Sequence, residues 1–262
     1  MRIGFIGTGG ISEAMIRGLV GHAGYREPIF VSKRSANRSG RLAEDFQNVT
    51  VLDDNQELVD RSDWVVLAVL PGQAEHVVQD LKFNSTHTVI SLVAGLELKS
   101  LLALLSPAQE ICRLIPLPPI EYGTGPIPLF PCLPKVADFL QPLGTVIPVE
   151  DEACFTVFSA CSALMANFFE ATAWQARWME EQGVPREEAA RYASSLSAGL
   201  SALTTRSDPA ELQSLSRECL TAGGLNEHVL NKSLEIDWFD RIRVPLEQVL
   251  SRLKQAGGPG AG

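Results

Sequence analysis

The sequence predicts an α/β protein in which a doubly wound parallel sheet forms the N-terminal domain and an all-helical domain follows. Over the first half of the chain, short apolar runs alternate with segments of helix-forming residues. This alternation is typical of parallel strands joined by right-handed helical crossovers. Between residues 149 and 182 there is neither glycine nor proline, which predicts an unusually long helix or a slightly broken pair. We therefore expect domains at 1–150 and 151–255, with a disordered tail at 256–262.

Continuous apolar runs mark the expected strands, because strands inside a parallel sheet are covered on both faces. These strands are expected at 3–6, 29–32, 63–69, 88–93 and 111–115. Helices are expected at 13–19, 73–81 and 98–105 in the first domain, and at 186–205, from 209, 226–233 and 238–254 in the second. Seven prolines between residues 116 and 134 predict stiff extended segments there, with an edge strand at 127–130.

Composition narrows the possible partners and the compartment. The net charge of −9 argues against a nucleic-acid surface and an anionic membrane surface. No apolar run approaches the roughly 18 residues of a spanning helix, and the chain enters its first strand without a signal-peptide pattern. The five cysteines are scattered and form no Cys-x-x-Cys pair, so we expect neither a disulfide framework nor a metal site. The cytoplasm is the simplest location.

A glycine-rich turn follows the first strand and precedes the first helix. Its pattern is Gly7-x-Gly9-x-x-Ser12. Gly7 permits a tight turn, Gly9 lets the backbone approach a pyrophosphate, and Ser12 is small enough for the helix to pack on the strand. The diphosphate would lie on the helix N-terminus, where free N–H groups and the helix dipole favour an anion. This context predicts a dinucleotide-binding Rossmann domain; the alternative is a tight structural turn.

The end of the second strand indicates which nicotinamide cofactor binds. Sites that prefer NAD carry an Asp or Glu there to bind the ribose 2′-hydroxyl. Here the residues are Ser32, Lys33, Arg34 and Ser35, without a carboxylate. Hydroxyl donors and a guanidinium are what an adenosine 2′-phosphate needs. We therefore expect NADP, bound by Ser32, Arg34 and Ser35, with Lys33 as a further candidate; the alternative is a solvated basic loop.

Several motifs along the chain bear a resemblance to one enzyme family. They are the glycine-rich turn with 13–19, Leu67-Ala68-Val69-Leu70-Pro71, Ser91-Leu92-Val93-Ala94-Gly95, Gly183-Val184-Pro185-Arg186 and Thr221-Ala222-Gly223-Gly224. In this order and spacing, the chain resembles the pyrroline-5-carboxylate reductase family over nearly its whole length. The resemblance implies a reductase that transfers a hydride from NADPH to the carbon of a cyclic imine. It also implies a homodimer through the helical domain, with the active site at the dimer interface.

The resemblance implies roles for individual residues. The substrate carboxylate would be held at the start of a helix by Gly223, Gly224, Leu225 and Asn226. Beside the expected phosphate pocket, the cofactor-binding residues would be Gly7, Thr8, Gly9, Gly10, Ile11, Ala68, Val69, Leu70, Pro71, Ala94, Gly95 and Pro116. The catalytic candidates are Asn226, Thr221 and His228.

Each catalytic candidate has a second interpretation. Asn226 stands where the family has a threonine that bonds the imine nitrogen, and it could equally be the N-cap of its helix. His228 suits proton donation to an imine nitrogen, or it is an exposed helix residue. The helix dipole alone explains Glu227, and Thr221 could serve helix-end packing. The other histidines, His22, His76 and His87, match no motif and are expected on the surface.

Three other functions remain possible. A β-hydroxyacid-type dehydrogenase has a similar architecture, but it normally carries a catalytic lysine on the long helix, and 149–182 contains no lysine. A deazaflavin-dependent reductase shares this type of nucleotide domain, but the long helical domain fits it poorly. An NADP-binding regulatory protein without catalysis is the third. The family's Asn-Thr pair beside the nicotinamide is here Leu117-Pro118, and its two threonines after the double glycine are Leu225 and Asn226.

Overall fold

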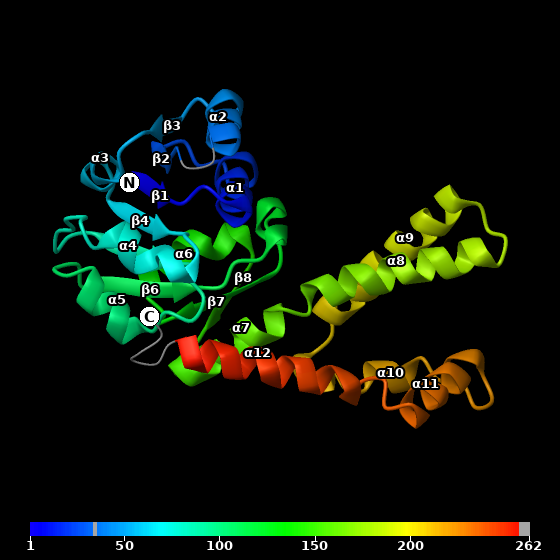
Figure 1. The fold of residues 1–262 in the computed structure, drawn as a ribbon. Coiled ribbons are helices and arrows are strands. Elements are labelled where there is room, and N and C mark those ends of the chain that lie inside the picture. The colour runs from blue at the N-terminus through cyan, green and yellow to red at the C-terminus, as the bar shows by residue number, and fades with distance from the viewer. Residues whose placement is uncertain (34–35, 257–262) are drawn as a thin grey trace. The chain divides into compact units, whose positions relative to one another are not determined.

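The computed structural model describes residues 1–33 and 36–256 (Figure 1). The chain divides into two compact units. The first comprises Met1–Ala160 together with the chain from Val249 onward, and the second comprises Cys161–Gln248. The division therefore falls inside a helix, α7 (Glu152–Ser162), whereas the sequence placed the domain boundary at residue 150.

The first unit contains an eight-stranded sheet with the strand order β3-β2-β1-β4-β5-β6-β7-β8. The strands are β1 (Ile3–Ile6), β2 (Ile29–Ser32), β3 (Val49–Leu52), β4 (Trp64–Leu67), β5 (Thr88–Ser91), β6 (Glu110–Leu114), β7 (Pro126–Phe130) and β8 (Thr145–Pro148). All neighbouring strands pair in parallel except β6 and β7, which are antiparallel. The strand order reverses between β1 and β4, the switch point at which doubly wound sheets bind ligands.

Helices cover both faces of the sheet (Figure 1). They are α1 (Gly10–Arg17), α2 (Ala36–Asp45), α3 (Asn55–Arg61), α4 (Ala74–Val78), α5 (Leu98–Leu104) and α6 (Pro134–Leu140). One core packs beneath α1, α2 and α6, and the other beneath α3, α4 and α5. Shorter helical turns complete the unit: a π-helical η1 (Gly18–His22) and the 3-10 helices η2 (Pro71–Gln73), η3 (Pro118–Tyr122) and η4 (Gln141–Leu143). The predicted fold class is confirmed.

The proline-rich region differs from its prediction in two ways. Residues Pro118–Tyr122 form the 3-10 helix η3 rather than an extended segment. The strand β7 is not an edge strand, because β8 pairs with it on the outer side. The carbonyl of Pro128 accepts from Ile115 N at 3.1 Å, so the N–H that proline lacks would have faced β6. Pairing with β6 covers only two registered residue pairs, and proline is therefore tolerated there.

A buried ion pair anchors the start of α7 to β6. Arg113 Nη1 lies 2.5 Å from Glu152 Oε1, and the Arg113 side chain is 4% exposed. The same carboxylate oxygen accepts from Leu98 N at 2.7 Å, and the guanidinium carbon lies 4.6 Å from the centre of the Phe155 ring. Burial lowers the pKa of Arg113, and the hydrogen bond to Glu152 opposes that shift. These contacts fix α7 against the sheet.

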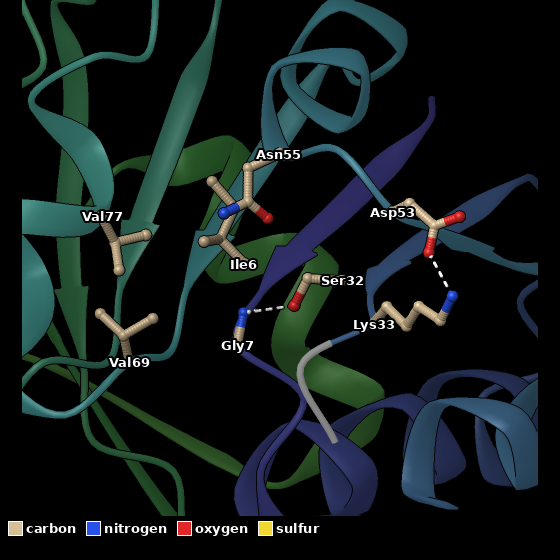
Figure 2. A pocket seen from close by; sticks show the side chains of 8 residues that line it. All are labelled: Ile6, Gly7, Ser32, Lys33, Asp53, Asn55, Val69 and Val77. Atoms are coloured by element: carbon tan, nitrogen blue, oxygen red, sulfur yellow. Dashed lines mark hydrogen bonds and ion pairs between the residues drawn. The ribbon is translucent and has the colours of Figure 1, made fainter. Parts of the chain in front are cut away.

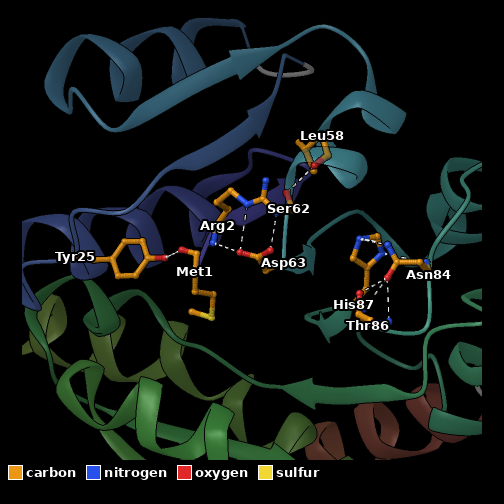
Figure 3. A network of polar contacts seen from close by, with 9 residues as sticks. All are labelled: Met1, Arg2, Tyr25, Leu58, Ser62, Asp63, Asn84, Thr86 and His87. Carbon is orange, nitrogen blue, oxygen red and sulfur yellow. Dashed lines mark hydrogen bonds and ion pairs between the residues drawn. The ribbon is translucent and has the colours of Figure 1, made fainter.

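Polar networks in loops at the amino ends of β1, β4 and β5 add two further anchors (Figure 3). Arg2 donates to the Asp63 carboxylate from its backbone N–H and its guanidinium, which lowers the pKa of Asp63 to about 2. Tyr25 donates to the carbonyl of Met1. His87 is 3% exposed, so its expected surface position is wrong. Asn84 Oδ1 accepts from His87 N at 3.1 Å and from Thr86 N at 2.9 Å, a loop contact that no sequence pattern marks.

The second unit is helical. Its elements are the end of α7, then α8 (Met165–Glu181), α9 (Arg186–Arg206), η5 (Pro209–Glu211), α10 (Leu215–Glu218), α11 (Leu225–Glu235), η6 (Asp240–Ile242) and the start of α12 (Arg243–Ala256). The slightly broken helix pair is confirmed, since a turn at residues 163–164 interrupts the helix between α7 and α8. The helix expected from residue 209 is only a short turn followed by α10. Helices α8 and α9 lie side by side, joined by a 3.0 Å contact between Thr172 Oγ1 and Ser197 Oγ.

Helices α7 and α8 also correct the expectation that no run could span a membrane. By length and composition alone, the 30-residue stretch Glu152–Glu181 is long and apolar enough to do so. Only 11% of its apolar window is buried within this single chain. Large apolar side chains of α8 are accordingly exposed, among them Phe169 at 58% and Trp174 at 51%. An apolar surface of this kind requires a cover, which is either another protein surface or lipid.

Candidate active site

Gly7 makes the turn that ends β1. Its φ of +96° is a conformation that residues with a side chain rarely adopt. A Cβ added at Gly7 would lie 2.4 Å from the carbonyl oxygen of Ala68, at the end of the neighbouring strand β4. Both conditions exclude a side chain, so glycine is required here by backbone geometry and by the close approach of two strands.

Three buried hydroxyl groups form hydrogen bonds that stabilise this turn. Gly7 N donates to Ser32 Oγ at 2.9 Å, and Thr8 Oγ1 donates to the Ser32 carbonyl at 2.7 Å. Ser12 Oγ donates back to the Gly7 carbonyl at 2.7 Å. Thr8, Ser12 and Ser32 are all buried. The structure thus gives Ser32, expected as a phosphate ligand, a bracing contact between β1 and β2 (Figure 2).

The start of α1 is open. Its N-cap is Gly9, and no side chain caps the helix. A Cβ added at Gly9 or Gly10 would meet no atom within 4 Å. A pocket lined by Gly9, Gly10 and Ile11 adjoins this helix start, where the helix dipole favours an anion such as a diphosphate. The turn fits the phosphates of a dinucleotide.

A crevice runs along the carboxyl ends of β1, β2, β4 and β5. It consists of two adjoining pockets of about 430 and 410 Å³ that share Gly7 and Val69. The first is lined by Ile6, Gly7, Ser32, Lys33, Asp53, Asn55, Val69 and Val77. The second is lined by Gly7, Thr8, Gly9, Gly10, Ile11, Ala68, Val69, Leu70, Pro71, Gln73, Leu92 and Ala94. The crevice lies at the switch point of the sheet, where this fold binds dinucleotides.

Most of the expected cofactor-binding residues meet in this crevice. Gly95 and Pro116 follow the adjoining strands β5 and β6 but line neither pocket. Arg34 and Ser35 lie outside the described residues.

Three polar residues of the crevice are absent from the predicted site, namely Gln73, Asp53 and Asn55. Asp53 and Asn55 follow β3, a strand that was not predicted. Lys33 Nζ pairs with Asp53 Oδ1 at 2.7 Å, and both side chains are exposed (Figure 2). The hydrogen bond to Asp53 raises the pKa of Lys33. A carboxylate therefore does lie at this end of the crevice, but it follows β3 rather than β2.

The catalytic and substrate candidates lie together in the second unit, around the start of α11. Gly223 has a φ of +72°, and its N–H donates to Glu227 Oε2 at 2.7 Å. Gly224 N donates to the Thr221 carbonyl at 2.7 Å. The two glycine N–H groups expected to hold a substrate carboxylate thus have partners within the segment. The remaining donors for an anion are the N–H groups of the first turn, beginning at Leu225.

Asn226 is not the N-cap of this helix. The cap position is Gly224, and no side chain caps it. The Asn226 amide instead donates to the carbonyl of Cys219 at 3.0 Å. Thr221, Asn226 and His228 are all exposed. Their exposure leaves them accessible to a ligand, and the roles of these three residues stay predictions.

Comparisons with known proteins agree with this geometry. The family model described as "NADP oxidoreductase coenzyme F420-dependent" matches residues 2–95. A pyrroline-5-carboxylate reductase of Treponema pallidum (strain Nichols) is 32% identical over 246 residues, which span 88% of this chain and 92% of that protein. The chain belongs to the pyrroline-5-carboxylate reductase family.

Other members of the pyrroline-5-carboxylate reductase family extend the likeness. The enzyme of Pseudomonas aeruginosa is 27% identical over 267 residues, which cover 97% of this chain and 94% of that protein. The crystal structure of Plasmodium falciparum pyrroline carboxylate reductase with NADP bound has a TM-score of 0.84 at 19% identity and covers 98% of both chains. The whole fold is therefore shared with the family.

Proposed function

We propose that this protein is an NADPH-dependent reductase that transfers a hydride to the C=N bond of a cyclic imine. The observation that carries the proposal is the open helix start after Gly9, which faces a crevice at the switch point of the sheet. Membership of the pyrroline-5-carboxylate reductase family supplies the reaction type. NADPH, when bound, supplies the hydride, and the protein groups bind and orient the two reactants.

The residues of this chain divide the work between binding and protonation. The turn at Gly7 and Gly9 would hold the diphosphate, and residues 68–71 would form the wall beside it. In the second unit, first-turn N–H groups of α11 would bind a substrate carboxylate. Asn226 would donate its amide to the imine, and His228 would supply the proton that the nitrogen takes up.

NADPH consumption tests this function directly. The substrates are pyrroline-5-carboxylate, pyrroline-2-carboxylate and the piperideine carboxylates, with NADH measured alongside. Turnover of one imine, faster with NADPH, is expected and would identify the ring. Asn226→Ala should reduce turnover far more than NADPH affinity. If the melting temperature falls together with the activity, Asn226 has a structural role instead.

One observation favours a second candidate, an NADP-binding regulatory protein without catalysis. The N–H groups of Gly223 and Gly224 are satisfied within the chain, and the Glu227 carboxylate occupies the start of α11. A substrate carboxylate would have to compete with that negative charge. Tight NADPH binding without turnover of any of these imines would favour this candidate over the reductase.

We further propose that two copies of the chain associate through the helical unit, in the cytoplasm. The exposed apolar side chains of α8 and α9 support a homodimer, with Phe168, Trp178, Leu200 and Leu203 each at least 51% exposed. All five cysteines are free thiols, which agrees with a reducing compartment. Light scattering should give twice the monomer mass of 28.4 kDa, and a monomeric mass would contradict the association.

A further inference from the structure

Lys33 and Asp53 directly follow the neighbouring strands β2 and β3, and their side chains meet. Ser32 and Leu52 are registered partners at the ends of β2 and β3, so the residues that follow them emerge side by side. Lys33 N donates to the Leu52 carbonyl at 3.1 Å, which fixes the backbone at this point. The Lys33 and Asp53 side chains meet at 2.7 Å and are 61% and 77% exposed. The ion pair therefore rests on a rigid base at the mouth of the crevice.

The pair lies at the adenosine end of the crevice. The diphosphate end is set by Gly9 and the open start of α1. In this fold the residues after the second strand meet the 2′-position of the adenosine ribose. Figure 2 shows Lys33 and Asp53 on one side of the Gly7–Ser32 contact, with Val69 and Val77 on the other. Any 2′-substituent must therefore come close to this ion pair.

The two charges act in opposite directions on the cofactor. An ammonium group attracts the 2′-phosphate of NADPH, whereas a carboxylate repels it and accepts hydrogen bonds from the ribose hydroxyls of NADH. In the structure the Lys33 ammonium and the Asp53 carboxylate form an ion pair with each other. Lys33 must leave Asp53, or share itself with it, in order to bind a phosphate. Asp53 would remain close by with its negative charge.

We infer that Asp53 is a specificity-determining residue that weakens the preference for NADPH over NADH by competing for Lys33 and by repelling the 2′-phosphate. The inference rests on the proposed nucleotide site. It assigns a role to a residue that follows β3, which the sequence at the end of β2 does not reveal. An ordinary exposed ion pair would leave the choice between NADPH and NADH unaffected, and the inference predicts that the Lys33–Asp53 pair changes it.

Calorimetric binding of 2′,5′-ADP and 5′-AMP tests the inference, because these probes differ only in the 2′-phosphate. For Asp53→Asn the Kd of 2′,5′-ADP should fall about three- to tenfold while that of 5′-AMP stays constant or rises. The matched control is Glu110→Gln. Glu110 forms an exposed pair with Lys135 and also accepts from Thr88 Oγ1 at 3.1 Å, but it lies at the amino end of β6. The control removes the same charge and should leave the affinity ratio unchanged.

A double-mutant cycle with Lys33→Met completes the test. Lys33→Met should lose more affinity for 2′,5′-ADP than Lys33→Met/Asp53→Asn, because the single variant leaves the carboxylate unbalanced. A ratio of the two Kd values that Asp53→Asn changes by less than about twofold would overturn the inference. Equal changes in Asp53→Asn and Glu110→Gln would overturn it too. If the wild-type chain binds neither probe nor NADPH, the proposed nucleotide site is wrong. If it binds them but Asp53→Asn leaves the ratio of Kd values unchanged, only the role of Asp53 is wrong.

Discussion

Helices α1 and α11 both have a glycine as their N-cap residue, and no side chain caps either helix. The two helices differ in which groups lie beside the first turn. At α1, a Cβ on Gly9 would meet nothing within 4 Å, and the nearby Glu13 carboxylate is engaged by Arg17 at 3.3 Å. At α11, a Cβ on Gly224 would lie 2.8 Å from the Thr221 carbonyl. Glu227 already accepts from the preceding Gly223 N–H.

The difference shows that the same backbone device can be left open or closed by the chain itself. An uncapped helix start offers several N–H donors and a positive dipole end. The start of α1 keeps both for a ligand. At α11 the first-turn N–H groups are also uncapped, but the Glu227 carboxylate lies beside them on the Gly223 N–H, so a ligand anion there meets a negative charge. A glycine pair before a helix is therefore no measure of anion affinity until its neighbours are known.

Gly7→Ala should have the largest effect on stability and NADPH binding, because it disrupts the turn that connects β1 to the start of α1. A side chain at φ +96° is strained, and its Cβ would lie 2.4 Å from the Ala68 carbonyl. We expect a loss of about 3 kcal/mol or more in the free energy of unfolding, with loss of NADPH binding. Urea unfolding and calorimetry measure the two effects. An unchanged stability would contradict the turn geometry.

Ser32→Ala should come next, by removing the brace of the same turn. The buried N–H of Gly7 would lose its 2.9 Å acceptor, which costs about 1–3 kcal/mol. The unfolding midpoint in urea should fall with little change in slope. If stability holds and only NADPH binding falls, Ser32 is a phosphate ligand first and a brace second.

Gly9→Ala separates ligand approach from folding. The Cβ has free space in the protein, so the melting temperature should stay constant. NADPH affinity should fall about tenfold, or roughly 1.4 kcal/mol, because the methyl group occupies the position of the diphosphate. Gly199→Ala, also in open space but on α9, is the control and should bind NADPH normally. Normal binding by Gly9→Ala would place the diphosphate elsewhere.

Glu227→Gln has the smallest expected effect and tests the closed helix start. Glutamine can still accept from Gly223 N–H, but it carries no charge. The KM for a carboxylate-bearing imine should fall about two- to fivefold, in line with one charge at a helix N-terminus. Glu187→Gln, in the first turn of α9, is the control and should leave the KM unchanged. A raised KM would instead make Glu227 a substrate-binding group.

The sequence predicted the elements whose signal is local and missed those that depend on neighbours. The bounds of β1 and β2 matched, because all four residues of each strand are buried and apolar or small. The strand β3 has only one neighbour and exposes Thr50, so it lacks that continuous apolar pattern. Missing it also hid Asp53 and Asn55, which can be placed in the crevice only once their strand is known.

The same reasoning applies to the candidate site. The glycine-rich turn could be located because its spacing is visible in the local sequence: Gly7 answers a backbone requirement, and Gly9 leaves room for a ligand. The partner of Glu227, a backbone N–H four residues earlier, depends on the positive φ of Gly223. The contact of Asn226 with Cys219 depends on how the preceding loop folds back. Neither follows from residue type or spacing.

The hydroxyl-braced turn has a consequence for how the crevice responds to salt. The groups that would meet the diphosphate are uncharged N–H groups at the start of α1, whereas the other end of the crevice carries the full charges of Lys33 and Asp53. Charge–charge forces reach about 30 Å at 0.01 M ionic strength but only about 8 Å at 0.15 M. Binding of the diphosphate should therefore weaken only modestly as ionic strength rises, because salt screens the partial charges of a helix dipole as well. Discrimination at the ribose should instead be tuned by the electrolyte around the protein.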